Sequence, residues 1–237
     1  MPTTRRERIR DATLLEIKEV AREHLRAHGP SGISLRGIAR DIGMTAPALY
    51  RYYAGLDDLL AAMIESYGDE MSDMLEAARD AVPEADVDGR LLAVTRAFRR
   101  WALDHRPEFT MIFGAPVPGF GDLLGARKGG SRLGGIFFSL FAELWERRPF
   151  PIPAEEEIAP TLRDQLRRFA ADCGADEDQV PLGVIRLYAS SWVRLYGLVA
   201  MEVFGHMHFM LENAEPFFEA ELSDLGRIIG VTPQGAP

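Results

Sequence analysis

The sequence predicts an all-α protein, in which an N-terminal three-helix helix-turn-helix domain is followed by a helical-bundle domain. Apolar residues recur at helical spacing along most of the 237-residue chain, and no segment shows the alternation of a β-strand. Clusters of Gly and Pro separate the helical segments. A hydrophobic content of 47% suffices to bury a large core. We therefore expect two domains, residues 1–55 and residues 56–237.

The first expected helix ends at about His28, where Gly29-Pro30 interrupts the pattern. Its apolar stripe can cover the following helices from behind. The stripe consists of Ile9, Thr13, Ile17, Val20, Ala21 and Leu25. Arg5 and Arg6 precede this helix, and they are either an arm that reaches phosphates or the minor groove, or simply solvated side chains.

Residues 33–53, ISLRGIARDIGMTAPALYRYY, contain two short helices and a tight turn between them. Ser34 is suited to cap the first helix, because its side chain can accept a hydrogen bond from a backbone N–H of the first turn. Gly43 is suited to the left-handed position that ends a helix, and Thr45 follows as the cap of the second helix. Pro47 falls in the first turn of that helix, where its missing N–H is not needed. This arrangement predicts a helix-turn-helix.

The second of these helices leaves a surface suited to a DNA groove. Leu49 and Tyr53 are four residues apart on this helix and are expected to point into the core. The side chains left outside are small at the leading end and hydroxyl-bearing or basic behind it. With Arg36 from the preceding helix, the candidate DNA contacts are Arg36, Thr45, Ala46, Pro47, Ala48, Tyr50, Arg51 and Tyr52. A helical hairpin without a role in DNA binding is the alternative interpretation.

The charge of the chain is divided unevenly. Residues 1–53 hold ten Arg or Lys and six Asp or Glu, a net charge of +4. The rest of the chain holds 17 basic and 30 acidic residues, a net charge of −13, which gives −9 for the whole. A basic N-terminal quarter can lie against phosphates while the acidic remainder stays away from them.

Six further helices are expected in the remainder of the chain. The first begins with Asp57 and Asp58, which favour the positive end of a helix dipole, and it connects the basic quarter to the acidic body. Arg106-Pro107 interrupts the pattern before a short apolar segment. The expected helices cover residues 56–81, 91–105, 136–148, 155–174, 181–205 and 215–229.

Two loops are expected between these helices. Residues 82–89 contain Pro83, and residues 114–135 contain eight glycines and two prolines. The glycine-rich loop does not fit a phosphate-binding pattern, because Gly119, Gly121 and Gly125 miss the GxGxxG spacing and no strand precedes them. A lid over a pocket and plain disorder remain as its alternative interpretations.

Two parts of the chain resemble the domains of a known protein family. Residues 33–53, the long helix before them and the aspartate-rich connector after them resemble the DNA-binding domain of TetR-type transcriptional regulators. The run from Trp192 to His206 resembles the WHG-type C-terminal domain of some of these regulators. Two residues depart from the common pattern: Leu56 stands where many relatives have a Lys that contacts a phosphate, and Gly37 is unusual within a helix.

The resemblance implies a homodimer with about ten helices per subunit, whose last two long helices form a four-helix interface. It implies that Arg36, Pro47, Ala48, Tyr50 and Arg51 meet bases or phosphates of an operator. It also implies a small-molecule effector pocket in the body. We therefore expect a transcriptional repressor that the effector releases from a palindromic, double-stranded DNA operator, by tilting the connector and moving the two recognition helices out of register.

The effector pocket is expected among the aromatic and methionine residues of the body. Such residues at helical spacing are also ordinary core, and this remains the alternative. The candidates are Trp101, Phe109, Met111, Phe113, Phe137, Phe141, Trp145, Tyr188 and Trp192. Glu202 and His206 are four residues apart, but a helical pair without a third ligand is usually a packed or surface pair.

Other classes of protein fit the sequence less well. No nucleophile is paired with a base and no HExxH motif is present, so we expect neither an enzyme nor a bound cofactor or metal. The single cysteine, Cys173, excludes an internal disulfide and suits the cytoplasm, and no apolar segment reaches the ~20 residues that span a membrane. A helical dimerisation module, or a small-molecule-binding protein without DNA binding, is the alternative function.

Overall fold

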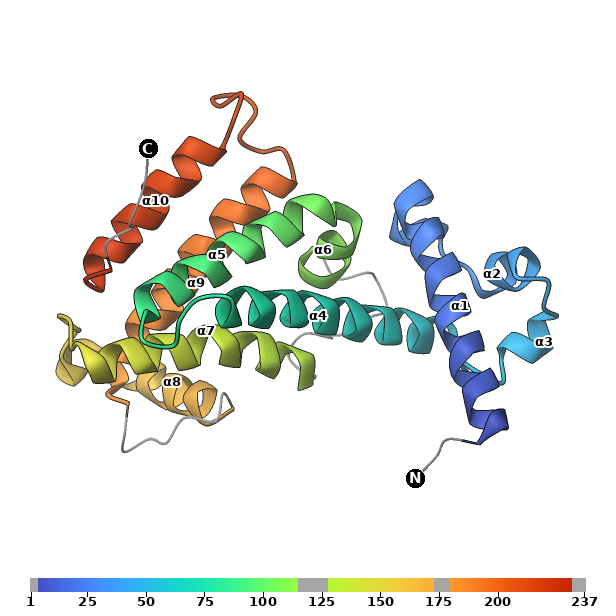
Figure 1. Ribbon diagram of the computed structural model, residues 1–237, viewed down its shortest axis with the longest axis horizontal. Helices are drawn as coiled ribbons and strands as arrows, with labels where there is room; N and C mark the ends of the chain where they lie inside the picture. Colours follow the sequence, from blue (N-terminus) through green and yellow to red (C-terminus); the bar gives the residue numbers. More distant parts are fainter. Residues whose placement is uncertain (1–3, 115–127, 173–179, 232–237) are drawn as a thin grey trace. The chain divides into compact units, whose positions relative to one another are not determined.

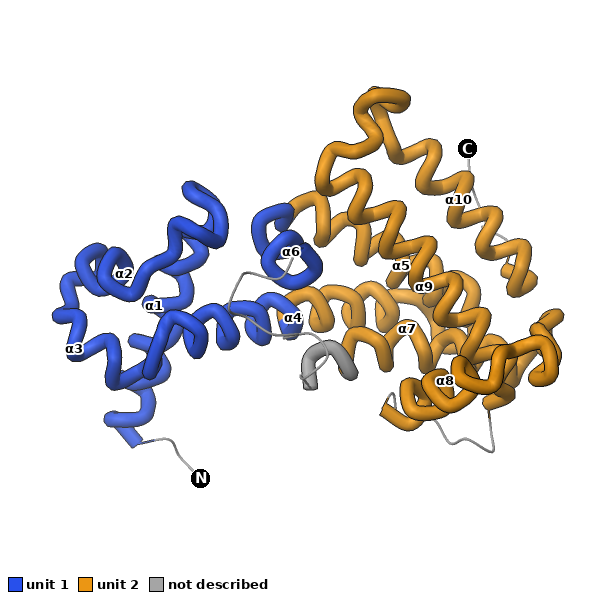
Figure 2. Tube along the Cα trace, turned by 180° about the vertical axis from the view of Figure 1, so that it is seen from behind, with its two compact units in different colours: residues 1–69, 105–127 blue, residues 70–104, 128–237 orange. Residues whose placement is uncertain are grey.

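The computed structural model describes residues 4–114, 128–172 and 180–231, and within these ranges the chain contains helices and no strand (Figure 1). The predicted all-α fold is confirmed. No helix in the described ranges is long and apolar enough to cross a membrane. The chain forms two compact units (Figure 2): unit 1 comprises residues 1–69 and 105–127, and unit 2 comprises residues 70–104 and 128–237.

Unit 1 contains the helix-turn-helix. Its helices are α1 (Arg5–His28), the 3₁₀ turn η1 (Pro30–Gly32), α2 (Leu35–Asp41), α3 (Ala46–Leu49), the first part of α4 (Leu56–Asp80) and α6 (Arg106–Phe113). A capping box starts α1, because Thr4 Oγ1 accepts from the N–H of Glu7 and Glu7 Oε2 accepts from the N–H of Thr4. The predicted end of this helix at His28 is confirmed.

A buried carboxylate ties three helices of unit 1 together. Glu108 of α6 is 0% exposed, and its Oε1 lies 2.7 Å from Nη2 of Arg26 and 3.6 Å from Nε of Arg22, both on α1. The Arg22 guanidinium also lies over the ring of Tyr67 on α4, 4.6 Å from the centroid. Burial raises the pKa of the Tyr67 phenol to about 12. This cluster fixes α6 and α4 to α1.

Unit 2 is a bundle of long helices. It comprises the second part of α4, α5 (Val87–Asp104), α7 (Lys128–Arg147), the turn η2 (Glu155–Glu157), α8 (Pro160–Asp172), α9 (Leu182–Val203) and α10 (Glu215–Ile228). Aromatic rings from three of these helices pack together: the ring centroids of Phe98 and Phe137 are 6.0 Å apart, and each lies 5.6 Å from that of Trp192. The core of unit 2 is therefore built by α5, α7 and α9.

Both expected loops, residues 82–89 and 114–135, are shorter than predicted. Helix α5 begins at Val87 instead of Leu91, because Asp86 Oδ1 accepts from the N–H of Gly89 at 2.8 Å and caps the helix. Helix α7 begins at Lys128, so the expected loop at 114–135 is wrong from that residue on. Leu133, Ile136 and Phe137 of α7 are buried, and their packing outweighs the poor helix propensity of the nearby glycines.

The remaining expected segments are either outside the described residues or close to the observed helices. Residues 115–127 of the expected loop 114–135, for which a lid and disorder were the alternative interpretations, lie outside the described residues, as does Cys173. The expected helix 155–174 is divided into η2 and α8, with Pro160 in the first position of α8. The helices expected at 181–205 and 215–229 agree with α9 and α10 to within two residues at each end.

Candidate nucleic-acid interface and ligand cavity

Helix α2 begins as predicted and packs closely against α1. Ser34 Oγ accepts from the N–H of Gly37 at 3.1 Å. A Cβ at Gly37 would lie 2.9 Å from Ser34 Oγ and 3.2 Å from Cε1 of His24, so the unusual mid-helix glycine leaves room for both side chains. His24 Nε2 in turn lies 2.8 Å from Oδ2 of Asp41. Hydrogen bonds from Arg40, and then from His24, lower the pKa of the Asp41 carboxyl.

The turn between α2 and α3 is a Schellman motif. Gly43 has a φ of 69°, as predicted for a left-handed position. Its N–H donates to the carbonyl of Arg40 at 3.2 Å, and the N–H of Met44 donates to the carbonyl of Ala39 at 2.8 Å. These bonds satisfy the last carbonyls of α2 and set the direction in which the chain enters α3.

Helix α3 differs from the prediction in two ways. Thr45 occupies the predicted N-cap position, but its side chain makes no capping hydrogen bond. The position of the cap was therefore predicted correctly, and its side-chain hydrogen bond was not. The helix spans only Ala46–Leu49, and bonds from Arg51 N to Ala48 O and from Tyr52 N to Leu49 O continue it as a tighter turn. Pro47 lies in the first turn, as predicted.

The structure places the candidate DNA contacts on one solvent-facing segment and the adjacent helix. Leu49 is 0% and Tyr53 8% exposed, and both point inward as predicted. Of the candidates, Arg36, Thr45, Pro47, Tyr50 and Arg51 are exposed, and Ala46, Ala48 and Tyr52 are half-buried. We call residues 45–52 the reading segment.

One cation beside the reading segment was missed by sequence reasoning. The guanidinium of Arg10, on α1, lies over the ring of Tyr52 at 5.6 Å from its centroid. Arg10 is exposed, so it adds positive charge next to the reading segment. Its position on the exposed side of the first helix was the only signal in the sequence, and that signal is shared by many surface arginines.

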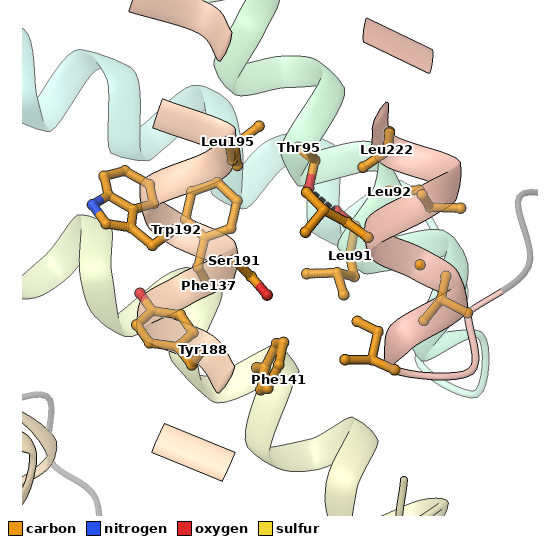
Figure 3. Close-up of a pocket in the computed structure, with 14 residues that line it drawn as sticks. Leu91, Leu92, Thr95, Phe137, Phe141, Tyr188, Ser191, Trp192, Leu195 and Leu222 are labelled. Atoms are coloured by element: carbon orange, nitrogen blue, oxygen red, sulfur yellow. Dashed lines mark hydrogen bonds between the residues drawn. The ribbon is translucent and has the colours of Figure 1, made fainter. Parts of the chain in front are cut away.

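Unit 2 contains a cavity of about 60 Å³ between α5, α7, α9 and α10 (Figure 3). Four of the nine pocket candidates line it: Phe137, Phe141, Tyr188 and Trp192. The other five do not line this cavity. Trp101, Phe109 and Met111 are buried core residues, and Phe113 and Trp145 are half-buried elsewhere.

The prediction considered aromatic residues and methionines, and it therefore missed other residues that line the cavity. Among them are Leu91, Leu92, Thr95 and Leu222. Their helical spacing in the sequence predicts that they are buried, but it does not predict that they border a cavity. Glu202, whose spacing to His206 could have suited a shared metal, accepts two 2.7 Å hydrogen bonds from Arg99. Among the described residues, no group of three His, Cys, Asp or Glu side chains could hold a metal ion.

Comparison with known families identifies the class of protein. Residues 17–63 match the model of bacterial regulatory proteins of the tetR family, and residues 91–225 match that of the tetracyclin repressor-like C-terminal domain. The helix-turn-helix in unit 1 therefore belongs to a DNA-binding transcriptional regulator. The chain is a member of the TetR family. The WHG subtype expected for its C-terminal part stays a prediction.

Individual relatives agree with this assignment. The chain is 28% identical over 209 residues to the HTH-type transcriptional regulators Rv1816 of Mycobacterium tuberculosis and Mb1846 of Mycobacterium bovis, covering 87% of each chain. It is 30% identical to SCO4313, a protein described as regulatory, with a TM-score of 0.73 over 94% of this chain and 98% of that one. The TetR family regulator PfmR from Thermus thermophilus shares the fold, with a TM-score of 0.50 and 16% identity over 89% and 97% of the chains.

Proposed function

We propose that this regulator is a homodimeric repressor, and that a small-molecule effector releases it from a palindromic DNA operator. The observation that carries the proposal is that Thr45, Pro47, Tyr50 and Arg51 of the reading segment are exposed, while Leu49 of the same segment is fully buried in the core of the helix-turn-helix. The assignment of residues 1–55 to DNA binding, and of residues 56–237 to effector binding and dimerisation, is part of the same proposal.

The side chains of the reading segment suit contact with DNA. Arg51, or Arg36 from α2, can pair with guanine through two hydrogen bonds. Ala46, Pro47 and Ala48 are small and apolar, which permits close approach and contact with thymine methyl groups. The hydroxyls of Thr45, Tyr50 and Tyr52 can donate to phosphates, which fix the position of the helix without reading sequence.

The exposed apolar face of α9 and α10 supports a homodimer. Val193 is 67% exposed on α9, and further large apolar side chains are exposed along both helices and at the end of α9. They are Met201, Phe204, Phe217 and Ile228. A second copy of the chain would cover these side chains with the same face, because a two-fold dimer uses one patch twice.

A selection experiment tests the proposed function. Full-length protein selects duplexes from a random-sequence pool, and the enriched duplexes are then titrated with wild type and the double variant Tyr50→Ala, Arg51→Ala. We expect a palindrome whose half-sites lie about one helical turn, or a multiple of it, apart. The double variant should lose operator binding and keep its dimer.

The alternative functions predict a different result. A helical dimerisation module, or a ligand-binding protein without DNA binding, would enrich no sequence. It would also behave alike as wild type and as the double variant. That outcome would refute the proposed function.

A further inference from the structure

The cavity in unit 2 has a lining of one chemical character. None of its lining residues carries a charge, and most are Leu, Ile, Val or aromatic side chains. Its volume of about 60 Å³ compares with the roughly 10–15 Å³ that one water molecule needs by the same kind of measure. The space is therefore large enough for several ligand atoms and offers them a mostly apolar lining.

The few polar groups at the cavity have already used their hydrogens. Ser191 Oγ donates to the carbonyl of Leu187 at 2.9 Å, and Thr95 Oγ1 donates to the carbonyl of Leu91 at 2.8 Å. Since a hydroxyl has a single hydrogen to donate, these two oxygens retain only lone pairs for a ligand. In Figure 3 the Ser191 hydroxyl points into the space between α9 and the helices opposite.

The aromatic residues present their carbon faces to the cavity. Tyr188 donates its hydroxyl hydrogen to the carbonyl of Gly134 at 3.2 Å. In Figure 3 the hydroxyl of Tyr188 and the ring nitrogen of Trp192 both point away from the space. The cavity thus offers hydrogen-bond acceptors but no side-chain donor among the hydroxyl and indole groups that line it.

One wall of the cavity is formed by a hydrogen-bonded turn at the end of α10. Gly230 has a φ of 71°, and the N–H of Val231 donates to the carbonyl of Gly226 at 2.8 Å. A Cβ at Gly226 would lie 2.6 Å from the carbonyl oxygen of Val231, so glycine is needed for this close approach. Gly226, Ile229 and Val231 all line the cavity.

We infer that this cavity binds an uncharged, largely apolar compound, which carries at most one hydrogen-bond donor, directed at Ser191. An anion would lose its hydration without gaining a donor, and a cation would find no carboxylate in the lining. The view that this compound is the effector rests on the proposed function. The inference that the cavity binds such a compound does not depend on the proposed function.

Three probes of similar size test the chemistry of the cavity in the full-length protein: toluene, phenol and benzoate. Calorimetric titration at neutral pH should show binding of toluene and phenol, and benzoate should bind at least tenfold more weakly. Ser191→Ala should weaken phenol several-fold and leave toluene unchanged, because only phenol uses the acceptor. Ser191→Phe should abolish binding of both, whereas Ser139→Phe, at an exposed position of α7, should not.

The outcomes distinguish a failure of the cavity assignment from a failure of the proposed regulatory function. Loss of toluene and phenol binding in Ser191→Phe, with retention in Ser139→Phe, supports the cavity assignment whether or not an operator has been found. Equal binding of benzoate, or unchanged binding in both Ser191 variants, overturns it. Because Ser191→Ala removes atoms without adding any, its phenol-specific effect remains decisive if Ser191→Phe fails to fold.

Discussion

Gly43 is a residue whose identity is dictated by backbone conformation alone. Its φ of 69° lies in the left-handed region, and a Cβ added there would meet no atom within 4 Å. We predict that Gly43→Ala destabilises the protein by about 1–2 kcal/mol, the cost of placing an L-residue in this conformation. Denaturant unfolding monitored by circular dichroism measures the change.

Gly68 provides a matched control for Gly43. It lies within α4, a Cβ there would also meet no atom within 4 Å, and its backbone is helical. Gly68→Ala should therefore stabilise the protein by up to about 1 kcal/mol. Equal shifts in the same direction for the two variants would contradict the conformational explanation.

Glu108 is the second position at which a single residue has a large expected effect. Its carboxylate is 0% exposed and pairs with Arg26 at 2.7 Å, which joins α6 to α1. We predict that Glu108→Gln destabilises the protein by roughly 3 kcal/mol, because it leaves arginine charge in a site built for a pair. Chemical denaturation, with the exposed Glu84→Gln as control, checks this, and a change below about 1 kcal/mol would refute it.

At the scale of elements, helix ends were predictable where the signal was local. Gly29-Pro30 ended α1, and Ser34 and Gly43 bounded α2, because caps and left-handed positions depend on one or two residues. Asp86 was an equally local cap and was overlooked. The start of α7 could not be found in this way, because long-range packing of its apolar face outweighs the glycines in its first turns.

The ion pair between Arg96 and Glu219 makes the stability of the protein depend on pH. Two hydrogen bonds from Arg96 of α5, at 2.9 and 2.7 Å, lower the pKa of the Glu219 carboxyl on α10. A lowered pKa in the folded state contributes stability above the ordinary carboxyl value of 4.5, and this contribution is lost as the pH falls through the lowered value.

Arg96→Gln tests this contribution. It should remove part of the stability seen above pH 4.5 and flatten the loss of stability on acidification. Thermal unfolding of wild type and variant from neutral to acidic pH measures the effect. The pair would make no such contribution if the two stability curves stayed parallel over the whole range.

At the scale of the whole molecule, the helical class, the helix-turn-helix and the exposed side of residues 45–52 were predictable from the sequence, because each follows from periodicity or from neighbouring residues. The cavity was only partly anticipated. Phe137, Phe141, Tyr188 and Trp192 line it, whereas Trp101 is buried elsewhere in the same unit. Helical spacing says that an aromatic side chain is buried, but which buried side chains border a void depends on how several helices pack.

The proposed dimer makes a prediction at the same scale. Val193→Glu places a charge on the exposed apolar face of α9, and a two-fold interface would contain this charge twice. We expect dissociation to monomers at micromolar concentration, measured by sedimentation velocity, and weaker operator binding. Ser139→Glu, at an exposed position of α7, is the control, and an intact dimer in Val193→Glu would contradict the proposed interface.

The most direct test of DNA reading by residues 45–52 is the affinity of the full-length protein for its selected operator across a salt series. We predict that affinity falls as salt rises, because phosphate contacts release counterions. Arg51→Ala should weaken binding by about 5- to 150-fold, corresponding to about 1–3 kcal/mol, whereas Arg168→Ala on the exposed side of α8 should leave it unchanged. Salt-independent binding, or equal effects of the two substitutions, would contradict the account.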